Sequence, residues 1–97
     1  MSFAEIHGQV IEWARERNIL KDSNHEHQMK KLEEEFNELR TTSNKFEIID
    51  GIGDMMIVLT ILAYFVGTTL DSCYRKAYFQ IKDRKGKMVD GLFVKDE

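Results

Sequence analysis

Residues 48–65, with the sequence IIDGIGDMMIVLTILAYF, are almost entirely apolar and yet contain two carboxylates, Asp50 and Asp54. A helix with apolar residues on most of its surface must be covered by other helices or by a partner chain. The longest run without a charged residue, 55–70, is shorter than the about 20 residues that a membrane-spanning helix needs. We therefore expect a buried helix in a soluble fold, without a membrane as partner.

Helix starts are marked clearly along the chain, which contains no proline. A Ser/Asn-x-x-Glu motif can pair a capping side chain with a reciprocal glutamate at the first turn of a helix. Three such motifs occur: Ser2 with Glu5, Ser23 with Glu26, and Asn44 with Glu47. They predict helices over residues 3–18, 24–41 and 45–66, and Gly67 is expected to end the third in a left-handed conformation.

A fourth helix is expected to begin after Thr69 or Asp71 and to run to about Lys85, where Gly86 would stop it. Beyond it, the pair Asp90-Gly91 stands between two short apolar runs, a pattern that favours a type I′ hairpin or an extended arm. Four helices joined by short loops predict an all-α, antiparallel four-helix bundle that forms a single domain over residues 1–97.

Size and charge limit the expected surroundings and partners. A 97-residue chain buries only about 60 to 65% of its unfolded surface, so we expect a homo-oligomer that adds core between copies. The net charge of −3 gives no basic field to attract nucleic acid. Cys73 is the one cysteine, and the amino terminus lacks the basic and apolar regions of a signal peptide. These features favour a reducing, cytoplasmic setting.

The helix expected over residues 24–41 combines an apolar stripe with acidic residues at its edge. The stripe consists of Met29, Leu32, Phe36 and Leu39. Glu35 lies at the edge of this stripe and Glu38 follows three residues later, a spacing that lets both side chains converge on one object. A solvated acidic face is the alternative for this glutamate-rich segment.

The next helix carries its acids on one strip. Glu47, Asp50 and Asp54 are spaced i, i+3 and i+7, so they share a face. Buried carboxylates must be hydrated, paired with bases or neutralised by a cation. Glycines at 51 and 53 suggest that a neighbouring helix or a ligand approaches closely beside the acids. The alternative is that both aspartates face solvent near the helix start.

If the two helices are neighbours, four carboxylates form an oxygen cage: Glu35, Glu38, Asp50 and Asp54. Carboxylate oxygens favour hard cations, so Mg²⁺ is the expected metal and Mn²⁺ is an alternative. The three histidines, His7, His25 and His27, offer no zinc site with the lone cysteine. We expect His7 at the surface or at the edge of the core. His25 and His27, at a helix start, are expected to be solvated, with contact to a ligand or a metal role as alternatives.

These acidic segments resemble a known family. The segments EEFNEL (34–39) and DGIGDMMIVL (50–59) resemble the Glu-Glu-x-x-Glu and Glu-x-x-Asp signature of MazG-like all-α nucleoside triphosphate pyrophosphohydrolases. The ending KAYFQIKDRKGKMVDGLFVK is similar to that of small phage and bacterial MazG-like proteins. This resemblance implies a helical bundle, assembled as a dimer or tetramer, that uses Mg²⁺ to hydrolyse nucleoside triphosphates to the monophosphate and pyrophosphate.

The resemblance also implies roles for individual residues. Glu35, Glu38 and Asp54 match metal ligands of the family. The family's remaining acid falls on Gly51, and Asp50, one turn before Asp54, is the expected substitute. Asn37 stands where the family often has glycine.

Further residues are expected to bind the substrate or the attacking water. A metal-bound triphosphate needs cations near its oxygens and a positioned water. Lys31, Lys82 and Arg84 are candidates for phosphate contact, although basic residues at 84–87 also complement a helix dipole. The remaining candidates are Trp13 and Tyr78 for stacking on the base, unless they are core residues, Gln28 as a polar contact, and Glu34 or Glu38 for orienting the water.

Two other function classes fit parts of the pattern. A non-catalytic nucleotide-binding or regulatory module on the same fold is favoured by Gly51, where the family has an acid. A ferritin-like di-metal carboxylate protein would need Glu-x-x-His pairs on facing helices, and the chain has none. Hydrolysis of nucleoside triphosphates, with a role in maintaining the nucleotide pool, remains the primary prediction.

Overall fold

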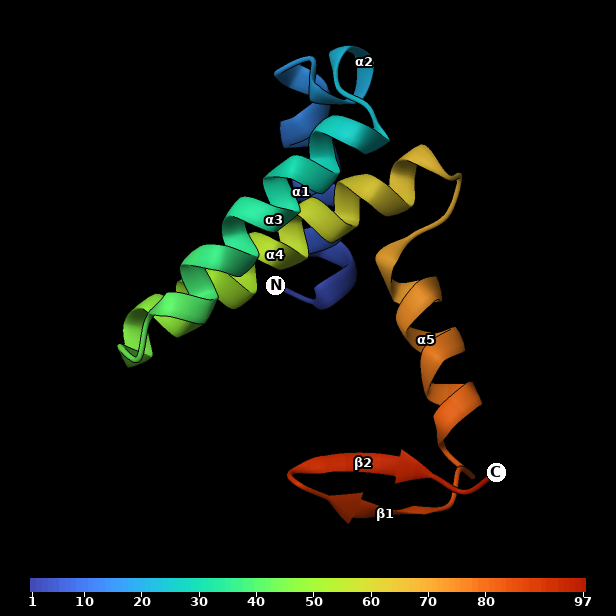
Figure 1. The fold of residues 1–97 in the computed structure, drawn as a ribbon. Helices are drawn as coiled ribbons and strands as arrows, with labels where there is room; N and C mark the ends of the chain where they lie inside the picture. Colours follow the sequence, from blue (N-terminus) through green and yellow to red (C-terminus); the bar gives the residue numbers. More distant parts are fainter.

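The computed structural model describes all residues from 1 to 97 and is mostly helical, with one small β-hairpin (Figure 1). The predominance of helix confirms the coarse prediction from the sequence. The elements are α1 (Phe3–Glu16), α2 (Ile19–Asp22), α3 (His25–Thr41), α4 (Lys45–Phe65), α5 (Leu70–Ile81), β1 (Gly86–Val89) and β2 (Leu92–Lys95).

Helix α1 begins as expected and ends earlier than expected. Glu5 N–H donates to Ser2 Oγ at 3.1 Å, and Ser2 N–H donates to Glu5 Oε1 at 3.4 Å, so the predicted capping box is present. The helix stops at Glu16 rather than at residue 18, because Asn18 adopts a left-handed conformation with φ of 62°. This turn leads into α2, a four-residue helix that the sequence did not predict.

The start of α3 corrects one predicted cap. Asn24, not Ser23, is the N-cap, and its Oδ1 accepts a hydrogen bond from His27 N–H at 2.9 Å. The hydroxyl of Ser23 instead accepts a hydrogen bond from Gln28 Nε2 at 3.0 Å. Asparagine and serine are about equally good caps, so side-chain preference alone does not distinguish the two positions.

Both predicted ends of α4 are found. Asn44 caps its start by accepting hydrogen bonds from the N–H groups of Phe46 and Glu47. The Glu47 carboxylate does not close the capping box and instead accepts a hydrogen bond from the Thr42 hydroxyl. At the other end, Gly67 has φ of 78°, and the N–H groups of residues 67 and 68 donate to the carbonyls of residues 64 and 63. This is the glycine-terminated ending expected from the sequence.

Helix α5 begins at the predicted cap but is shorter than predicted. Thr69 Oγ1 accepts a hydrogen bond from Ser72 N–H at 3.2 Å. The helix ends at Ile81 rather than near Lys85, because the chain turns toward strand pairing: Asp96 N–H donates to the Lys85 carbonyl at 2.9 Å.

The predicted hairpin is confirmed. Asp90 and Gly91 have φ of 50° and 82°, the backbone that a type I′ turn requires. Val89 pairs with Leu92 and Gly86 pairs with Lys95 in the antiparallel register. A Cβ atom at Gly86 would overlap the carbonyl oxygen of Val94, so this glycine is required by strand packing rather than by a helix end.

The long helices α3 and α4 pack side by side, and α1 packs on α4 (Figure 1). Helix α5 contacts α4 and then leads away from the other helices, with the hairpin beyond it. We refer to residues 70–97, which comprise α5 and the hairpin, as the C-terminal arm. One chain therefore forms only part of the predicted four-helix bundle, because α5 does not lie along the other helices.

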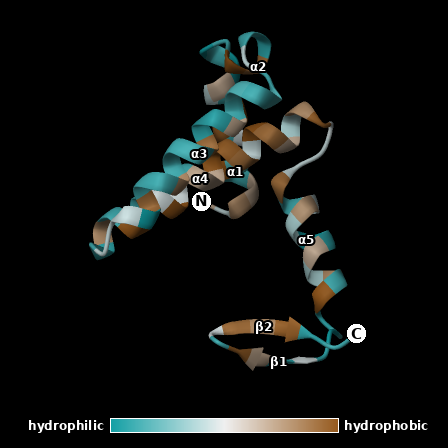
Figure 2. Cartoon of the chain, viewed as in Figure 1, coloured by the Kyte–Doolittle hydropathy of each residue, from teal (hydrophilic) through white to brown (hydrophobic).

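The buried core is small. Its apolar members with little exposure are Ala14, Val58, Ile61 and Ala63. Apolar residues are nevertheless frequent along α4 and on β2 (Figure 2), and many remain accessible to solvent, including Phe36 and Ile52. Helix α4 has 21 residues, and an 18-residue window of it has a mean hydropathy of 1.8. This is enough by length and composition for a membrane span, a test that core helices of soluble proteins also pass. Its assignment as a soluble core helix stays a prediction.

Candidate functional site

Glu35 is the most unusual polar residue in the structure. It lies on α3 facing α4, and its side chain is only 8% exposed. Its Oε1 atom lies 3.3 Å from Lys31 Nζ, whereas Oε2 is buried without any hydrogen-bond partner. Leaving a buried polar atom unpartnered costs about 1 to 3 kcal/mol, and more for a charged group. The position is therefore suited to a cation or a hydrogen-bond donor that would satisfy this oxygen.

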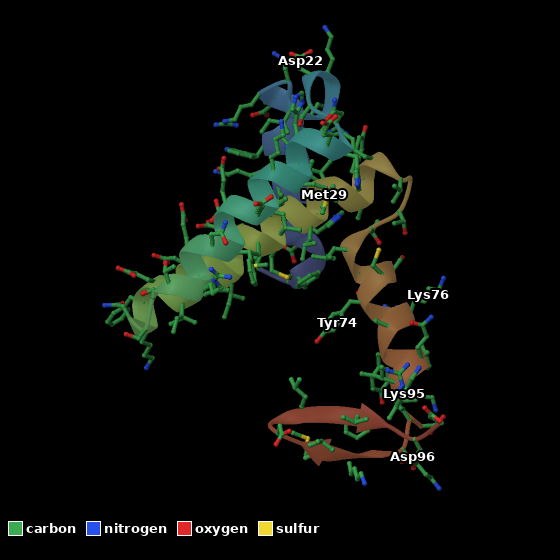
Figure 3. All side chains as sticks on the ribbon, viewed as in Figure 1. Asp22, Met29, Tyr74, Lys76, Lys95 and Asp96 are labelled. Carbon is green, nitrogen blue, oxygen red and sulfur yellow. The ribbon has the colours of Figure 1, made fainter.

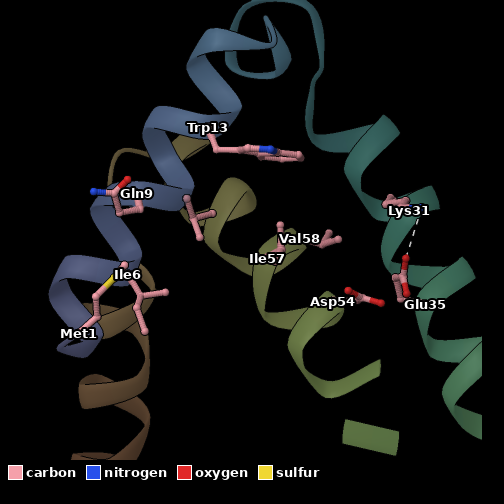
Figure 4. Close-up of a pocket in the computed structure, with 10 residues that line it drawn as sticks. Met1, Ile6, Gln9, Trp13, Lys31, Glu35, Asp54, Ile57 and Val58 are labelled. Atoms are coloured by element: carbon pink, nitrogen blue, oxygen red, sulfur yellow. Dashed lines mark ion pairs between the residues drawn. The ribbon is translucent and has the colours of Figure 1, made fainter. Parts of the chain in front are cut away.

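Asp54 of α4 faces Glu35 across the space between the two helices (Figure 4). Both carboxylates line a cavity of about 710 Å³, and Lys31 lies at the same end. The hydrogen bond that Lys31 donates to Glu35, together with the negative charge of Glu35, raises the pKa of Lys31, and Glu34 at 3.5 Å adds to this effect. Lys31 therefore stays protonated. It pairs with the buried Glu35 but not with Asp54, which faces Glu35.

The remainder of this cavity is largely apolar. Its walls come from the amino-terminal segment, from α1 and from the middle of α4: Met1, Ile6, Gln9, Val10, Trp13, Ile57 and Val58. The indole ring of Trp13 extends toward the α3 side of the cavity (Figure 4), and the Arg17 guanidinium lies 4.8 Å from the ring centre. The cavity thus has one end with charges and another with apolar and aromatic surface, a combination typical of sites for small polar ligands with a flat ring.

A second cavity of about 480 Å³ lies beside the first, and Asp54 lines both. Its lining includes four acids: Glu38, Glu47, Asp50 and Asp54. No basic side chain lies within salt-bridge distance of any of them. The sequence thus correctly predicted that acids of α3 and α4 face a common space.

The arrangement of these acids differs from a closed cage. No group of three or more acidic, histidine or cysteine side chains is close enough together to hold a metal ion in this structure. Glu35 and Asp54 share the first cavity, whereas Glu38 and Asp50 share the second with Asp54. Carboxylate oxygens are suitable ligands for a hard cation. The unpartnered Oε2 atom of Glu35 could serve as one of these ligands. Joint coordination would require rotation of Glu38 and Asp50, both of which are exposed.

The two glycines beside the acids have different surroundings. A Cβ atom at Gly51 would lie 3.1 Å from Cδ1 of Leu39, so α3 and α4 approach closely there, as predicted. A Cβ atom at Gly53 would meet nothing within 4 Å, so no helix of the same chain approaches it closely, and approach of a ligand there stays a prediction. A larger side chain at Gly51, such as the family's acid, would fit only if Leu39 moved.

Other residues that were predicted to bind substrate lie outside these cavities. Gln28 donates its hydrogen bond to Ser23. Tyr78, Lys82 and Arg84 belong to the C-terminal arm, which leads away from the acids (Figure 1). One chain therefore does not bring Tyr78 to Trp13, so the expected pair of stacking rings is not formed within it.

Several lining residues were missed by the sequence reasoning. The spacing of Ile6, Val10 and Trp13 on α1 is the 4-3 spacing of a helix face, a signal that could have identified one wall of the first cavity. Gln9 has no comparable signal, because exposed glutamines are common on helices.

Comparison with known proteins adds one relative. No protein-family model and no solved structure matches the chain. A protein of Haemophilus phage HP1 (strain HP1c1), described as an uncharacterized 18.2 kDa protein in the rep-hol intergenic region, is 46% identical over 57 residues. The matching region covers 56% of this chain and 35% of the phage protein. The chain is thus similar to part of a longer phage protein.

Proposed function

We propose that this protein is a Mg²⁺-dependent, MazG-like nucleoside triphosphate pyrophosphohydrolase that releases a nucleoside monophosphate and pyrophosphate. The observation that carries the proposal is the buried, unpartnered oxygen of Glu35 facing Asp54 at the charged end of a cavity whose other end is apolar. The resemblance of the acidic motifs to the family points to the same residues. The proposed enzyme acts on the cytoplasmic nucleotide pool as a homo-oligomer, either a dimer or a tetramer.

The proposed ligands of the metal are Glu35, Glu38, Asp50 and Asp54. A bound Mg²⁺ or Mn²⁺ supplies Lewis-acid stabilisation of phosphate charge and lowers the pKa of an attacking water. Glu38 is better suited than Glu34 to orient this water. Glu38 lines the acidic cavity, whereas Glu34 is 65% exposed and lies 3.5 Å from Lys31.

Other residues of the chain would bind different parts of the substrate at the two ends of the cavity. Lys31 provides a cation at the charged end, where it can donate hydrogen bonds to phosphate oxygens. Trp13 provides a flat apolar surface for the base, and base stacking on an aromatic side chain contributes about 1 to 3 kcal/mol. Stacking alone does not discriminate between bases, so any base preference would depend on contacts to the polar edge of the base.

A panel of ribo- and deoxyribonucleoside triphosphates incubated with Mg²⁺ tests the reaction. We expect pyrophosphate and the monophosphate as products, and chromatography separates them from orthophosphate and the diphosphate. Asp54→Asn should remove most of the turnover because it removes a charged ligand, whereas Asp71→Asn, an exposed aspartate of α5, should not. Orthophosphate release, or full turnover by Asp54→Asn, would rule out the proposed site.

A second candidate is a nucleotide-binding or regulatory module without catalysis. It is favoured by the dispersed acids, which form no cluster of three, and by Gly51 in place of the family's acid. Calorimetric titration with a nonhydrolysable triphosphate distinguishes the two. Binding without any product from the hydrolysable substrates would support the module, and product formation would exclude it.

A further inference from the structure

We propose that the C-terminal arm of one copy completes the acidic site of a second copy, with the basic loop of residues 82–87 placed against the second copy's acidic cavity. The partner that packs against this acidic cavity is thus a second copy of the same chain. What the completed site does rests on the proposed function, whereas the assembly itself does not.

The arm lacks a packing partner within its own chain. No residue of α5 is buried, and all residues of both strands are exposed. The uncovered side chains include large apolar ones, such as Phe79 and Leu92, which is 71% exposed. Tyr74 and Lys76 project from different sides of α5 into solvent (Figure 3). An isolated two-stranded hairpin is at best marginally stable in water, so this arm needs a surface to pack on.

The exposed area of the chain is large enough to build such an interface. The accessible surface is 7896 Å², whereas a compact monomer of 11.4 kDa has about 5,800 Å². The radius of gyration is 15.9 Å, compared with about 12.5 Å for a compact chain of this length. The excess of about 2,000 Å² exceeds the about 800 Å² that each partner contributes to a standard interface.

Charge identifies where the arm docks. The basic loop, which runs from the end of α5 into the start of β1, carries four cations and one acid: Lys82, Asp83, Arg84, Lys85 and Lys87. The second cavity carries four acids, and no base pairs with them within the chain. Helix α5 leads the basic loop away from this cavity in its own chain (Figure 1). The two charged surfaces can therefore be matched between copies, and a two-fold axis would form two equivalent sites.

This assembly brings to the site two residues of the arm, of which Lys82 pairs with the neighbouring Asp83 at 3.1 Å within its own chain. Lys82 and Arg84, predicted to contact phosphate, would reach the triphosphate in the second copy's site rather than in their own. Arg84 is suited to this because its guanidinium binds phosphate oxygens bidentately. The acids, the metal and Lys31 would come from one copy, and Lys82 and Arg84 from the other.

Disulfide crosslinking tests the assembly without any assay of activity. In a Cys73→Ser background, one chain carries Asp83→Cys in the basic loop, and a second chain of different tag length carries Thr41→Cys at the acidic cavity. Co-expression and mild oxidation should give a disulfide-linked heterodimer. The matched control pairs Asp83→Cys with Lys21→Cys on α2 and should give little. No heterodimer, or equal amounts in both pairs, would overturn the proposal.

Complementation tests the shared site. Asp54→Asn and the double variant Lys82→Ala/Arg84→Ala should each have little activity alone. Random pairing of the two variants in dimers should restore roughly a quarter of the wild-type activity. Half of the dimers are then mixed, and each mixed dimer has one intact site out of two. No recovery would show that the cations act within their own chain. If the wild type is itself inactive, the proposed function fails while the crosslinking result still decides the assembly.

Discussion

At the scale of single residues, the charge on Glu35 is expected to destabilise the protein when no metal is bound. Glu35→Gln removes this charge, and its amide can donate to the facing Asp54. The lost pair with half-exposed Lys31 contributes only about 0 to 1 kcal/mol, less than the about 1 to 3 kcal/mol cost of an unpartnered buried oxygen. We therefore expect a higher melting temperature without Mg²⁺ and the loss of stabilisation by added Mg²⁺.

Thermal unfolding with and without Mg²⁺ measures both effects. Glu33→Gln is the matched control, since Glu33 is exposed on the same helix and should leave the response to Mg²⁺ intact. An equal response to Mg²⁺ in wild type and Glu35→Gln would contradict a role for Glu35 in metal binding. A ligand that binds only the folded state raises stability in proportion to the logarithm of its concentration, so a titration gives its affinity.

Asp50 is the residue whose proposed role depends most on how the sequence differs from the MazG-like motif that it resembles. Asp50→Ala should raise the Mg²⁺ concentration needed for turnover, because it removes one acid from the cavity that Asp54 also lines. Magnesium titrations of the turnover of wild type and variant measure this. If the Mg²⁺ concentration needed for turnover is unchanged, Asp50 is not a metal ligand. The fourth ligand oxygen would then come from water or from Glu47, which lines the same cavity. Gly51→Glu, which introduces the acid of the MazG-like motif, should not rescue the variant, because its Cβ would lie only 3.1 Å from Cδ1 of Leu39.

At the scale of helices, glycines 51 and 53 of α4 form a matched pair. Alanine is more favourable than glycine in a helix by about 0.8 to 1 kcal/mol. Gly53→Ala adds its methyl group to open space and should stabilise the protein by about that amount. Gly51→Ala places a Cβ 3.1 Å from Leu39, and overpacking of about 1 to 3 kcal/mol should cancel or exceed the gain.

Urea unfolding of the two variants measures the difference. We expect the free energy of unfolding of Gly53→Ala to exceed that of Gly51→Ala by about 1 kcal/mol or more. If Gly53→Ala instead destabilises the protein, the space beside it is filled by a ligand or by a second copy.

Helix ends and the hairpin were largely predictable because their signals are local. The caps at Ser2 and Asn44, the left-handed Gly67 and the Asp90-Gly91 turn each follow from a few neighbouring residues. The predicted end of α5 was wrong because glycine can end a helix or begin a tightly packed strand. Only the contact of Gly86 with the partner strand distinguishes these roles.

The site was less predictable because it depends on contacts between helices. The sequence identified Glu35 as an edge residue, but its unpartnered oxygen depends on how α3 packs on α4. The direction of the arm depends on the backbone between α4 and α5 and on what covers it. No periodicity within α5 encodes that direction.

At the scale of the whole molecule, an apolar groove between α3 and α4 is left uncovered. Phe36 is 48% exposed and lines the groove with Met29 and Met55. A second copy that covers this groove would bury it, so we expect light scattering to show a dimer or a larger oligomer at micromolar concentration. The melting temperature should then rise with protein concentration, because association stabilises the folded state by mass action.

Phe36→Glu tests this expectation within the groove. In an oligomer that buries Phe36, the new carboxylate would be desolvated without a partner, so the variant should dissociate and lose the concentration dependence of its melting temperature. Asn37→Glu is the matched control: it adds the same charge to the next residue of α3, about 100° around the helix, and should remain assembled. Light scattering and melting curves over a hundredfold concentration range measure both variants. A wild-type protein that scatters as a monomer would contradict the expectation, as would a Phe36→Glu variant with unchanged mass, since either result leaves the groove open to water.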